Sequence, residues 1–125
     1  MSTSFQLQNN ALKELPHNIE AEQGILGAIL LNNEIFFDIS ETINVEHFYE
    51  PVHKLIFDVI GKMISKGQIA TPITLKSFFE VEKNLEEIGG SNYLVRLANS
   101  ALSLDYAKNY AHIIYNLAVR RGLYE

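Results

Sequence analysis

Residues 51–67 place the strongest constraint on the fold, because their apolar side chains recur at the spacing of one helical face. Pro51 stands where a helix would begin, and proline suits that position because its missing N–H is not needed there. Gly67 ends the pattern directly after Lys66. The apolar positions follow i, i+3, i+4 and i+7 and continue in the same way: Val52, Leu55, Ile56, Val59, Ile60, Met63 and Ile64. The segment therefore predicts an amphipathic helix with a long buried stripe.

Residues 16–31 form a second predicted helix. Asn18 can cap it, because its side-chain oxygen can accept a hydrogen bond from a free N–H of the first turn. Apolar residues then recur at helical spacing. Gly24 and Gly27 each lower helix stability by roughly 1 kcal/mol relative to alanine, so their presence indicates that another backbone approaches closely. We expect this helix to lie at the centre of the domain.

Four further helices are predicted from polar residues that can open a first turn. Phe37 is expected to widen the buried side of the first of them, which Asn44 ends. Pro72 is expected to keep the loop before the second of them out of helical conformation. The residues expected to open the four helices, in chain order, are Asn33, Thr74, Ser91 and Asp105.

The chain as a whole predicts an all-α fold, a compact orthogonal bundle of about six helices. No segment shows the alternation of a strand, and 125 residues are enough for one domain with a substantial core. Residues 1–15 are polar without a sustained period, so we expect a flexible lead-in to a helical domain over residues 16–125. Because the helical pattern reaches Glu125 without a stop signal, we expect a larger protein to continue beyond it.

Composition excludes several classes of function. The chain has no cysteine, which excludes disulfides, a thiol nucleophile and a cysteine-based metal site. No apolar run approaches the roughly 18 residues that span a bilayer, and the start of the chain lacks the pattern of a secretory signal. These features predict a cytoplasmic protein without membrane contact.

Acidic residues dominate the first half of the chain. The net charge is −5, and residues 14–50 contain eight acidic residues but no lysine or arginine. Glu20 and Glu22 stand in the first turn of the predicted 16–31 helix, where negative charge favours the helix dipole. A phosphate backbone would be repelled, so no direct nucleic-acid binding is predicted. The acids are either solvated helix faces or an acidic surface for a basic protein partner.

No sequence motif supplies catalytic chemistry. Gly61-Lys62-Met63 lacks the upstream glycine and the following hydroxyl residue of a phosphate-binding loop. The motifs of nucleophile elbows and of zinc proteases are also absent from the sequence. The sequence therefore predicts no catalytic and no cofactor-binding residue.

The nearest approach to a metal site is the set of His47, Glu50 and His53. Pro51 interrupts any helical face that the three could share, so structural roles are favoured and no metal ligand is predicted. In these roles His47 caps or packs at a turn, and His53 lies on the exposed or half-buried side of its helix. A small metalloenzyme built on the three residues is the alternative.

Four blocks of the sequence, taken together, resemble the amino-terminal domain of bacterial replicative DNA helicases, the DnaB family. A fifth stretch, from Tyr110-Ala111 to Gly122-Leu123, is similar to the last helix of that domain. The order and spacing of the blocks agree over about residues 15–123. The four blocks are Pro16 to Gln23 with Leu26-Gly27, Phe48-Tyr49 through His53 to Ile56-Phe57, Ile73-Thr74-Leu75, and Gly89-Gly90 with Tyr93-Leu94.

The resemblance implies a non-catalytic scaffold. In the family an all-helical domain leads into a helical hairpin, here truncated, and then into a RecA-like motor that binds ATP and magnesium. These amino-terminal domains form a collar on a hexameric ring, pair as a trimer of dimers, and help to recruit primase and, in some bacteria, a helicase loader. No cofactor is therefore expected in this chain. The alternative is a free-standing all-helical regulatory or adaptor protein, like a loader or an inhibitor, with the same fold.

The resemblance also suggests where partners would bind. Glu20 at the start of the 16–31 helix and Tyr93 near the start of its own helix are the first two candidates. Arg120 and Arg121 near the end of the last helix are the other two. The first two have a structural alternative: Glu20 would serve only the helix dipole, and Tyr93 would only close the core.

Overall fold

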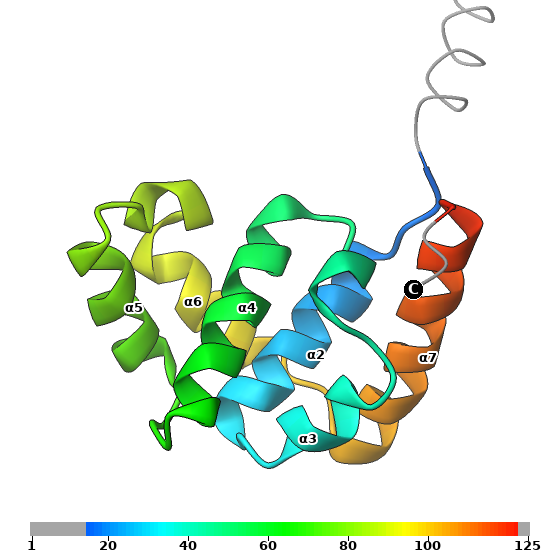
Figure 1. The fold of residues 1–125 in the computed structure, drawn as a ribbon, viewed down its shortest axis with the longest axis horizontal. Helices are drawn as coiled ribbons and strands as arrows, with labels where there is room; N and C mark the ends of the chain where they lie inside the picture. Colours follow the sequence, from blue (N-terminus) through cyan, green and yellow to red (C-terminus); the bar gives the residue numbers. More distant parts are fainter. Residues whose placement is uncertain (1–14, 123–125) are drawn as a thin grey trace, which may run out of the picture.

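The computed structural model describes residues 15–122, which form six α-helices and two short 3₁₀ helices and contain no strand (Figure 1). This confirms the all-helical prediction. Most of the expected lead-in and the expected continuation into a hairpin lie outside the described residues. The elements are α2 (Ile19–Leu31), α3 (Ile35–Ser40), η1 (Val45–His47), α4 (Pro51–Ser65), α5 (Pro72–Val81), η2 (Leu85–Ile88), α6 (Gly90–Asn99) and α7 (Leu104–Arg120).

Helix α2 lies at the centre, as predicted, and packs against α3, α4, α6 and α7 (Figure 1). Asn18 caps it, since its side-chain oxygen accepts a hydrogen bond from the Ala21 amide at 3.0 Å. A Cβ atom on Gly27 would lie 1.9 Å from the carbonyl oxygen of Leu97 in α6. Gly27 therefore permits the close backbone approach that its sequence position indicates, whereas Gly24 leaves room for the side chain of Leu102.

Helix α4 begins at Pro51 and buries the stripe that its spacing predicts. Ile56 and Ile60 are fully buried, and Phe57 packs against the buried ring of Phe48 with the ring centroids 5.0 Å apart. The turn before Pro51 thus places the aromatic side chain of Phe48 in the core.

Asn33 does not cap a helix, so this prediction was wrong. Its amide nitrogen donates to the carbonyls of Ile29 and Ala70, both at 2.8 Å, and its oxygen accepts from the Ala70 amide at 2.8 Å. The side chain is engaged with the end of α2 and the loop before α5 and is unavailable to α3. Helix α3 ends at Ser40, before the predicted stop at Asn44, and Phe37 is 58% exposed and does not extend its buried side.

The remaining helix starts also differ from prediction. Helix α5 begins at Pro72, because proline is tolerated at a first helical position, and Thr71 caps it while Thr74 completes a capping box. Helix α6 begins at Gly90, because Gly89, with φ of 92°, turns the chain directly from η2 into the helix and leaves Ser91 inside it. Helix α7 begins at Leu104, one residue before Asp105.

Candidate protein-interaction site

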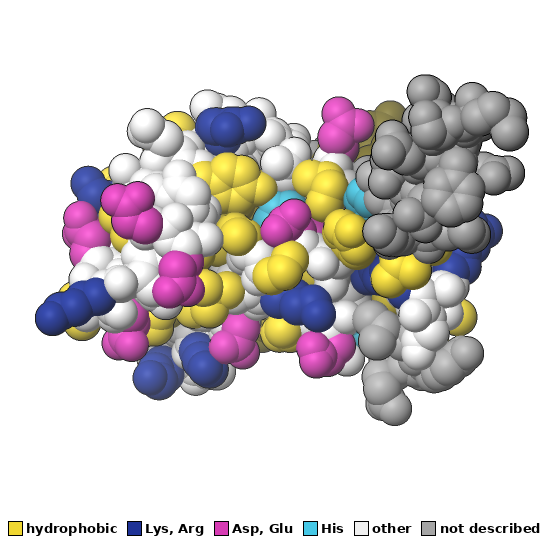
Figure 2. Space-filling model, turned by 90° about the horizontal axis from the view of Figure 1, so that it is seen from above, with side chains coloured by type: hydrophobic (Ala, Val, Ile, Leu, Met, Phe, Trp, Pro, Cys, Tyr) yellow, Lys and Arg dark blue, Asp and Glu magenta, His cyan; other side chains and the backbone are white. Residues whose placement is uncertain are grey.

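A hollow of about 420 Å³ opens where the first turns of α2 and α4 meet η2 and the start of α6. Figure 2 shows this end of the molecule, where apolar side chains gather with histidine and acidic side chains among them. Ile19, Val52 and Ile88 supply apolar walls. The other lining residues are Gln23, Glu50, Glu86, Glu87, Gly89 and Tyr93. An apolar pocket with a few polar and acidic side chains is suited to hold part of another molecule.

Tyr93 of α6 contributes a half-buried side chain to this pocket. The hydroxyl lies 2.5 Å from Nε2 of His53 and accepts a hydrogen bond from Nε2 of Gln23 at 3.1 Å. Burial raises the pKa of Tyr93 above its ordinary value of 10.0, although the hydrogen bond from Gln23 acts in the opposite direction. The guanidinium of Arg96 lies 5.8 Å from the ring centroid. The phenol is therefore neutral and fixed in orientation at neutral pH.

Glu22 and His53 form a buried pair behind Tyr93. The carboxylate of Glu22 is 1% exposed and the side chain of His53 is fully buried, with Nδ1 of His53 at 2.7 Å from Oε1 of Glu22. The prediction that His53 lies on the exposed or half-buried side of its helix was therefore wrong. The sequence does carry a signal for its burial, because His53 stands three residues before Ile56 and seven before Ile60, on the buried stripe of α4.

The hydrogen bonds around Glu22 define the arrangement of protons in this cluster. Its carboxylate accepts from the backbone amides of Tyr49 at 2.7 Å and Glu50 at 3.3 Å. A carboxylate has no hydrogen to donate, so it also accepts the hydrogen bond that joins it to the imidazole. The proton of His53 therefore lies on Nδ1. In the neutral tautomer Nε2 of His53 then accepts from the hydroxyl of Tyr93. Every polar group of the cluster is satisfied, which fits a positioning role for the buried pair.

The four predicted partner-binding residues lie at two places. Tyr93 lines the pocket, and the exposed Glu20 directly follows the pocket-lining Ile19 in α2. Arg120 and Arg121 lie at the other candidate surface, the carboxyl end of α7, and Arg120 is exposed there. The structure thus places Glu20 close to Tyr93 in the fold and separates both arginines from the pocket lining.

Arg121 makes contacts within the chain. Its guanidinium donates to the carbonyl oxygens of Pro16 at 2.8 Å and His47 at 2.7 Å. It also lies 5.4 Å from the ring centroid of Tyr49. Partial burial lowers the pKa of Arg121, while the nearby charge of Glu22 acts in the opposite direction. The side chain therefore joins the segment before α2, η1 and the end of α7.

The three residues considered for a metal site have separate roles. Nδ1 of His47 accepts from the backbone amide of Asn44 at 2.9 Å, which confirms the predicted capping role of His47. Glu50 lines the pocket, and His53 bonds to Glu22 and Tyr93. Across residues 15–122 no group of three or more histidine, aspartate or glutamate side chains is placed to hold a metal ion.

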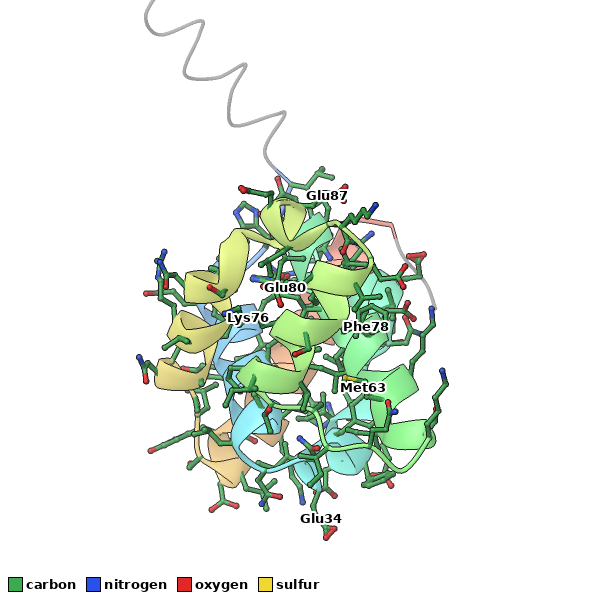
Figure 3. The ribbon with its side chains drawn as sticks, turned by 90° about the vertical axis from the view of Figure 1, so that its left-hand side faces the viewer. Glu34, Met63, Lys76, Phe78, Glu80 and Glu87 are labelled. Carbon is green, nitrogen blue, oxygen red and sulfur yellow. The ribbon has the colours of Figure 1, made fainter. Side chains whose placement is uncertain are left out.

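A second, wider hollow of about 750 Å³ lies between the end of α4 and α5 (Figure 3). Met63 and Phe78 are among its lining residues. Ile69, Ile73 and Val81, at 69%, 77% and 77% exposure, leave its rim apolar. In the described part of the chain no helix is both long and apolar enough to cross a membrane.

Comparison with known proteins decides the relationship of this chain. Residues 14–116 match the family described as "DnaB-like helicase N terminal domain". The chain belongs to this family. Members of the DnaB-like family that are similar to it include the replicative DNA helicase DnaB of Rickettsia typhi, with 47% identity over 109 residues that cover 87% of this chain and 22% of the relative. The corresponding helicase of Buchnera aphidicola is 36% identical over 96 residues, which cover 77% of this chain and 21% of the relative.

A solved DnaB-like structure shows the same fold. The crystal structure of the N-terminal domain of DnaB helicase from Mycobacterium tuberculosis superposes with a TM-score of 0.83 at 30% sequence identity. The alignment covers 88% of this chain and 80% of the crystallised one. The family resemblance inferred from the sequence blocks is therefore confirmed. The chain spans about a fifth of the length of the DnaB helicases that it matches.

Proposed function

We propose that this chain is a non-catalytic scaffold and interaction domain of a hexameric replicative DNA helicase in the cytoplasm. In this role it contacts neighbouring subunits and recruits primase or a helicase loader during DNA replication. The observation that carries the proposal is the match of residues 14–116 to the N-terminal domain of such helicases. In this proposal ATP and magnesium bind in a motor domain elsewhere in the helicase, since the match covers 22% of the relative.

The acidic pocket supports the recruitment part of this proposal. Glu50, Glu86 and Glu87 line it, and none of them pairs with a lysine or arginine within residues 15–122. A basic side chain from a partner would be attracted to these carboxylates and would make a cation–π contact with the half-buried ring of Tyr93. The pocket therefore favours a partner with an exposed arginine or lysine.

Binding of the purified chain to purified primase, measured by calorimetry, tests recruitment. Tyr93→Ala is expected to weaken binding about tenfold or more, because an aromatic anchor in a pocket carries much of the energy of an interface. Tyr106→Ala is the matched control, since Tyr106 is also a helical tyrosine but is 61% exposed and outside the pocket lining. Equal binding by both variants would contradict a role for the pocket. Repeating the titration with a helicase loader distinguishes the two partners.

Charge reversal tests the chemistry of the partner. Glu86→Lys with Glu87→Lys is expected to weaken binding, with the loss diminishing as salt is raised. Glu34→Lys with Glu41→Lys makes the same charge change at exposed positions beside α3 and outside both hollows, and Figure 3 shows Glu34 at the opposite end of the domain from the pocket-lining Glu87. If the two pairs of substitutions weaken binding equally, general charge attraction rather than the pocket holds the partner.

Two further measurements test the scaffold role. The purified chain is expected to show no ATP hydrolysis and no DNA binding at physiological salt, and clear turnover in a clean preparation would contradict the proposal. Sedimentation over a concentration series tests subunit contact. The exposed apolar rim at Ile69, Ile73 and Val81 is available for protein contact, and we expect concentration-dependent association.

A further inference from the structure

A continuous path of short contacts runs from the pocket to the carboxyl end of α7. It starts at the hydroxyl of Tyr93, which lies 2.5 Å from Nε2 of His53. On the other side of the imidazole, Nδ1 of His53 lies 2.7 Å from Oε1 of Glu22. Oε2 of Glu22 then accepts a hydrogen bond from the backbone amide of Tyr49 at 2.7 Å. Each step is a hydrogen bond, and both central side chains are almost entirely removed from water.

The path continues through the ring of Tyr49. That ring stacks on the imidazole of His17, with the ring centroids 4.0 Å apart and the planes 8° from parallel. The guanidinium of Arg121 lies 5.4 Å from the same ring and also holds the carbonyls of Pro16 and His47. We refer to Tyr49, His17 and Arg121 as the α7 clamp. It fastens the segment before α2 and the turn η1 to the end of α7.

Glu22 cannot change one of its bonds independently of the others. A buried carboxylate that loses a donor has no water to replace it, and an unsatisfied buried charged group is costly. If the hydrogen bond from Nδ1 of His53 to Oε1 of Glu22 is broken, the carboxylate must rotate toward its remaining donors, the amides of Tyr49 and Glu50. Those amides stand between η1 and α4, outside any helix, where the backbone can follow the movement.

We infer that Glu22 couples the Tyr93 hydroxyl to the α7 clamp, so that a group binding this hydroxyl from the pocket changes how firmly the end of α7 is held. The pocket and the end of α7 are two of the places where partner contacts are proposed, and the use of the coupling in recruitment rests on that proposed function. The coupling itself is a property of the free chain. It can be measured without any partner.

Amide hydrogen exchange in Tyr93→Phe tests the coupling, because this variant removes one oxygen and keeps the ring. We expect exchange of the Tyr49 and Glu50 amides to rise by about five- to tenfold relative to the Ile60 amide in the core of α4. The ratio to Ile60 removes any change in global stability. Tyr106→Phe loses an exposed hydroxyl and is the matched control. Exchange at Tyr49 and Glu50 that is equal in the two variants would overturn the inference.

The reverse direction gives a second test, because coupling between two sites is reciprocal. Arg121→Lys keeps the positive charge but removes the guanidinium group that donates to the carbonyls of Pro16 and His47. We expect this substitution to shift the ring signals of Tyr93 in the nuclear magnetic resonance spectrum. Arg120→Lys is the control on the neighbouring exposed arginine. Unchanged Tyr93 signals would overturn the inference even if Tyr93→Phe did not fold. If the unchanged chain does not bind primase but the coupling is observed, only the proposed function is contradicted. If the chain binds primase but no coupling is observed, only the coupling is contradicted.

Discussion

Nδ1 of His53 lies 2.7 Å from Oε1 of Glu22, and this bond joins α4 to α2 in the interior of the domain. The two residues stand 31 positions apart, and neither side chain has contact with bulk water. Because the carboxylate also accepts hydrogen bonds from the backbone amides of Tyr49 and Glu50, it fixes the turn that leads into α4. The pair therefore connects core packing with the geometry of the pocket at Tyr93.

Replacing His53 with alanine is expected to destabilise the domain by about 3 kcal/mol, because it leaves a buried carboxylate without its main donor. Urea unfolding monitored by circular dichroism measures the loss. His112→Ala is the control, since His112 is an exposed histidine on α7. A loss below about 1 kcal/mol would show that water or another donor replaces the imidazole.

Gly27→Ala is expected to prevent native packing or to cost about 3 kcal/mol, because the new Cβ would lie 1.9 Å from the Leu97 carbonyl oxygen. The new Cβ is fixed to the backbone of α2, and the atom that it meets belongs to the backbone of α6. No flexible side chain could therefore move to relieve the clash. Gly61→Ala is the comparison within α4, where a Cβ would meet only the ring of Phe36 at 3.1 Å. That variant is expected to be close to neutral in thermal unfolding, and equal losses in the two variants would contradict this account.

Stability is expected to fall in alkali through Tyr93. Burial raises the pKa of its phenol in the folded chain above 10.0, so the neutral form is favoured by folding. The contribution is fully present below pH 10 and is lost as the pH rises through the higher pKa of the folded state. Spectrophotometric titration of the phenols should show a late ionisation step from Tyr93, above pH 10. Tyr93→Phe should remove that late step, and its persistence would assign it to another residue.

Asn33→Ala is expected to cost about 2 kcal/mol, because it removes three hydrogen bonds to the backbone of Ile29 and Ala70. The loss would loosen the loop that leads into α5. Asn116→Ala on the exposed face of α7 should change the free energy of unfolding by less than about 0.5 kcal/mol. Chemical denaturation of the two variants provides the measurement. Similar values would contradict a stabilising role for the bonds of Asn33 to Ile29 and Ala70.

The helix pattern of this domain was predictable wherever local chemistry determines it. The apolar period of α4, its proline start and the Asn18 cap of α2 all act within one or two turns, and each stands where the sequence places it. The helix starts at Asn33 and Ser91 were predicted incorrectly for reasons outside their own turn. Asn33 bonds to a loop 37 residues away, and the left-handed backbone at Gly89 starts α6 earlier than Ser91.

The candidate site was predictable only in part. Tyr93 and Glu20 were named from the sequence, and the structure places Tyr93 in the pocket and Glu20 beside a residue that lines it. Gln23, Glu86 and Glu87 were not predicted as binding residues, because two separate elements, α2 and η2, bring them to the same hollow. Their role as a binding surface stays a prediction that the primase titrations will test.

The sequence by itself determined the fold class, the central position of α2 and the family, because periodicity, small residues and spaced motifs are properties of the chain. Only the tertiary structure decided which polar residues are buried. Glu22 belongs to an acidic helix start and His53 to an apolar stripe, and each alone would be costly to bury. Burial becomes favourable only when both meet the amides of Tyr49 and Glu50 and the hydroxyl of Tyr93, partners that folding brings together from distant parts of the chain.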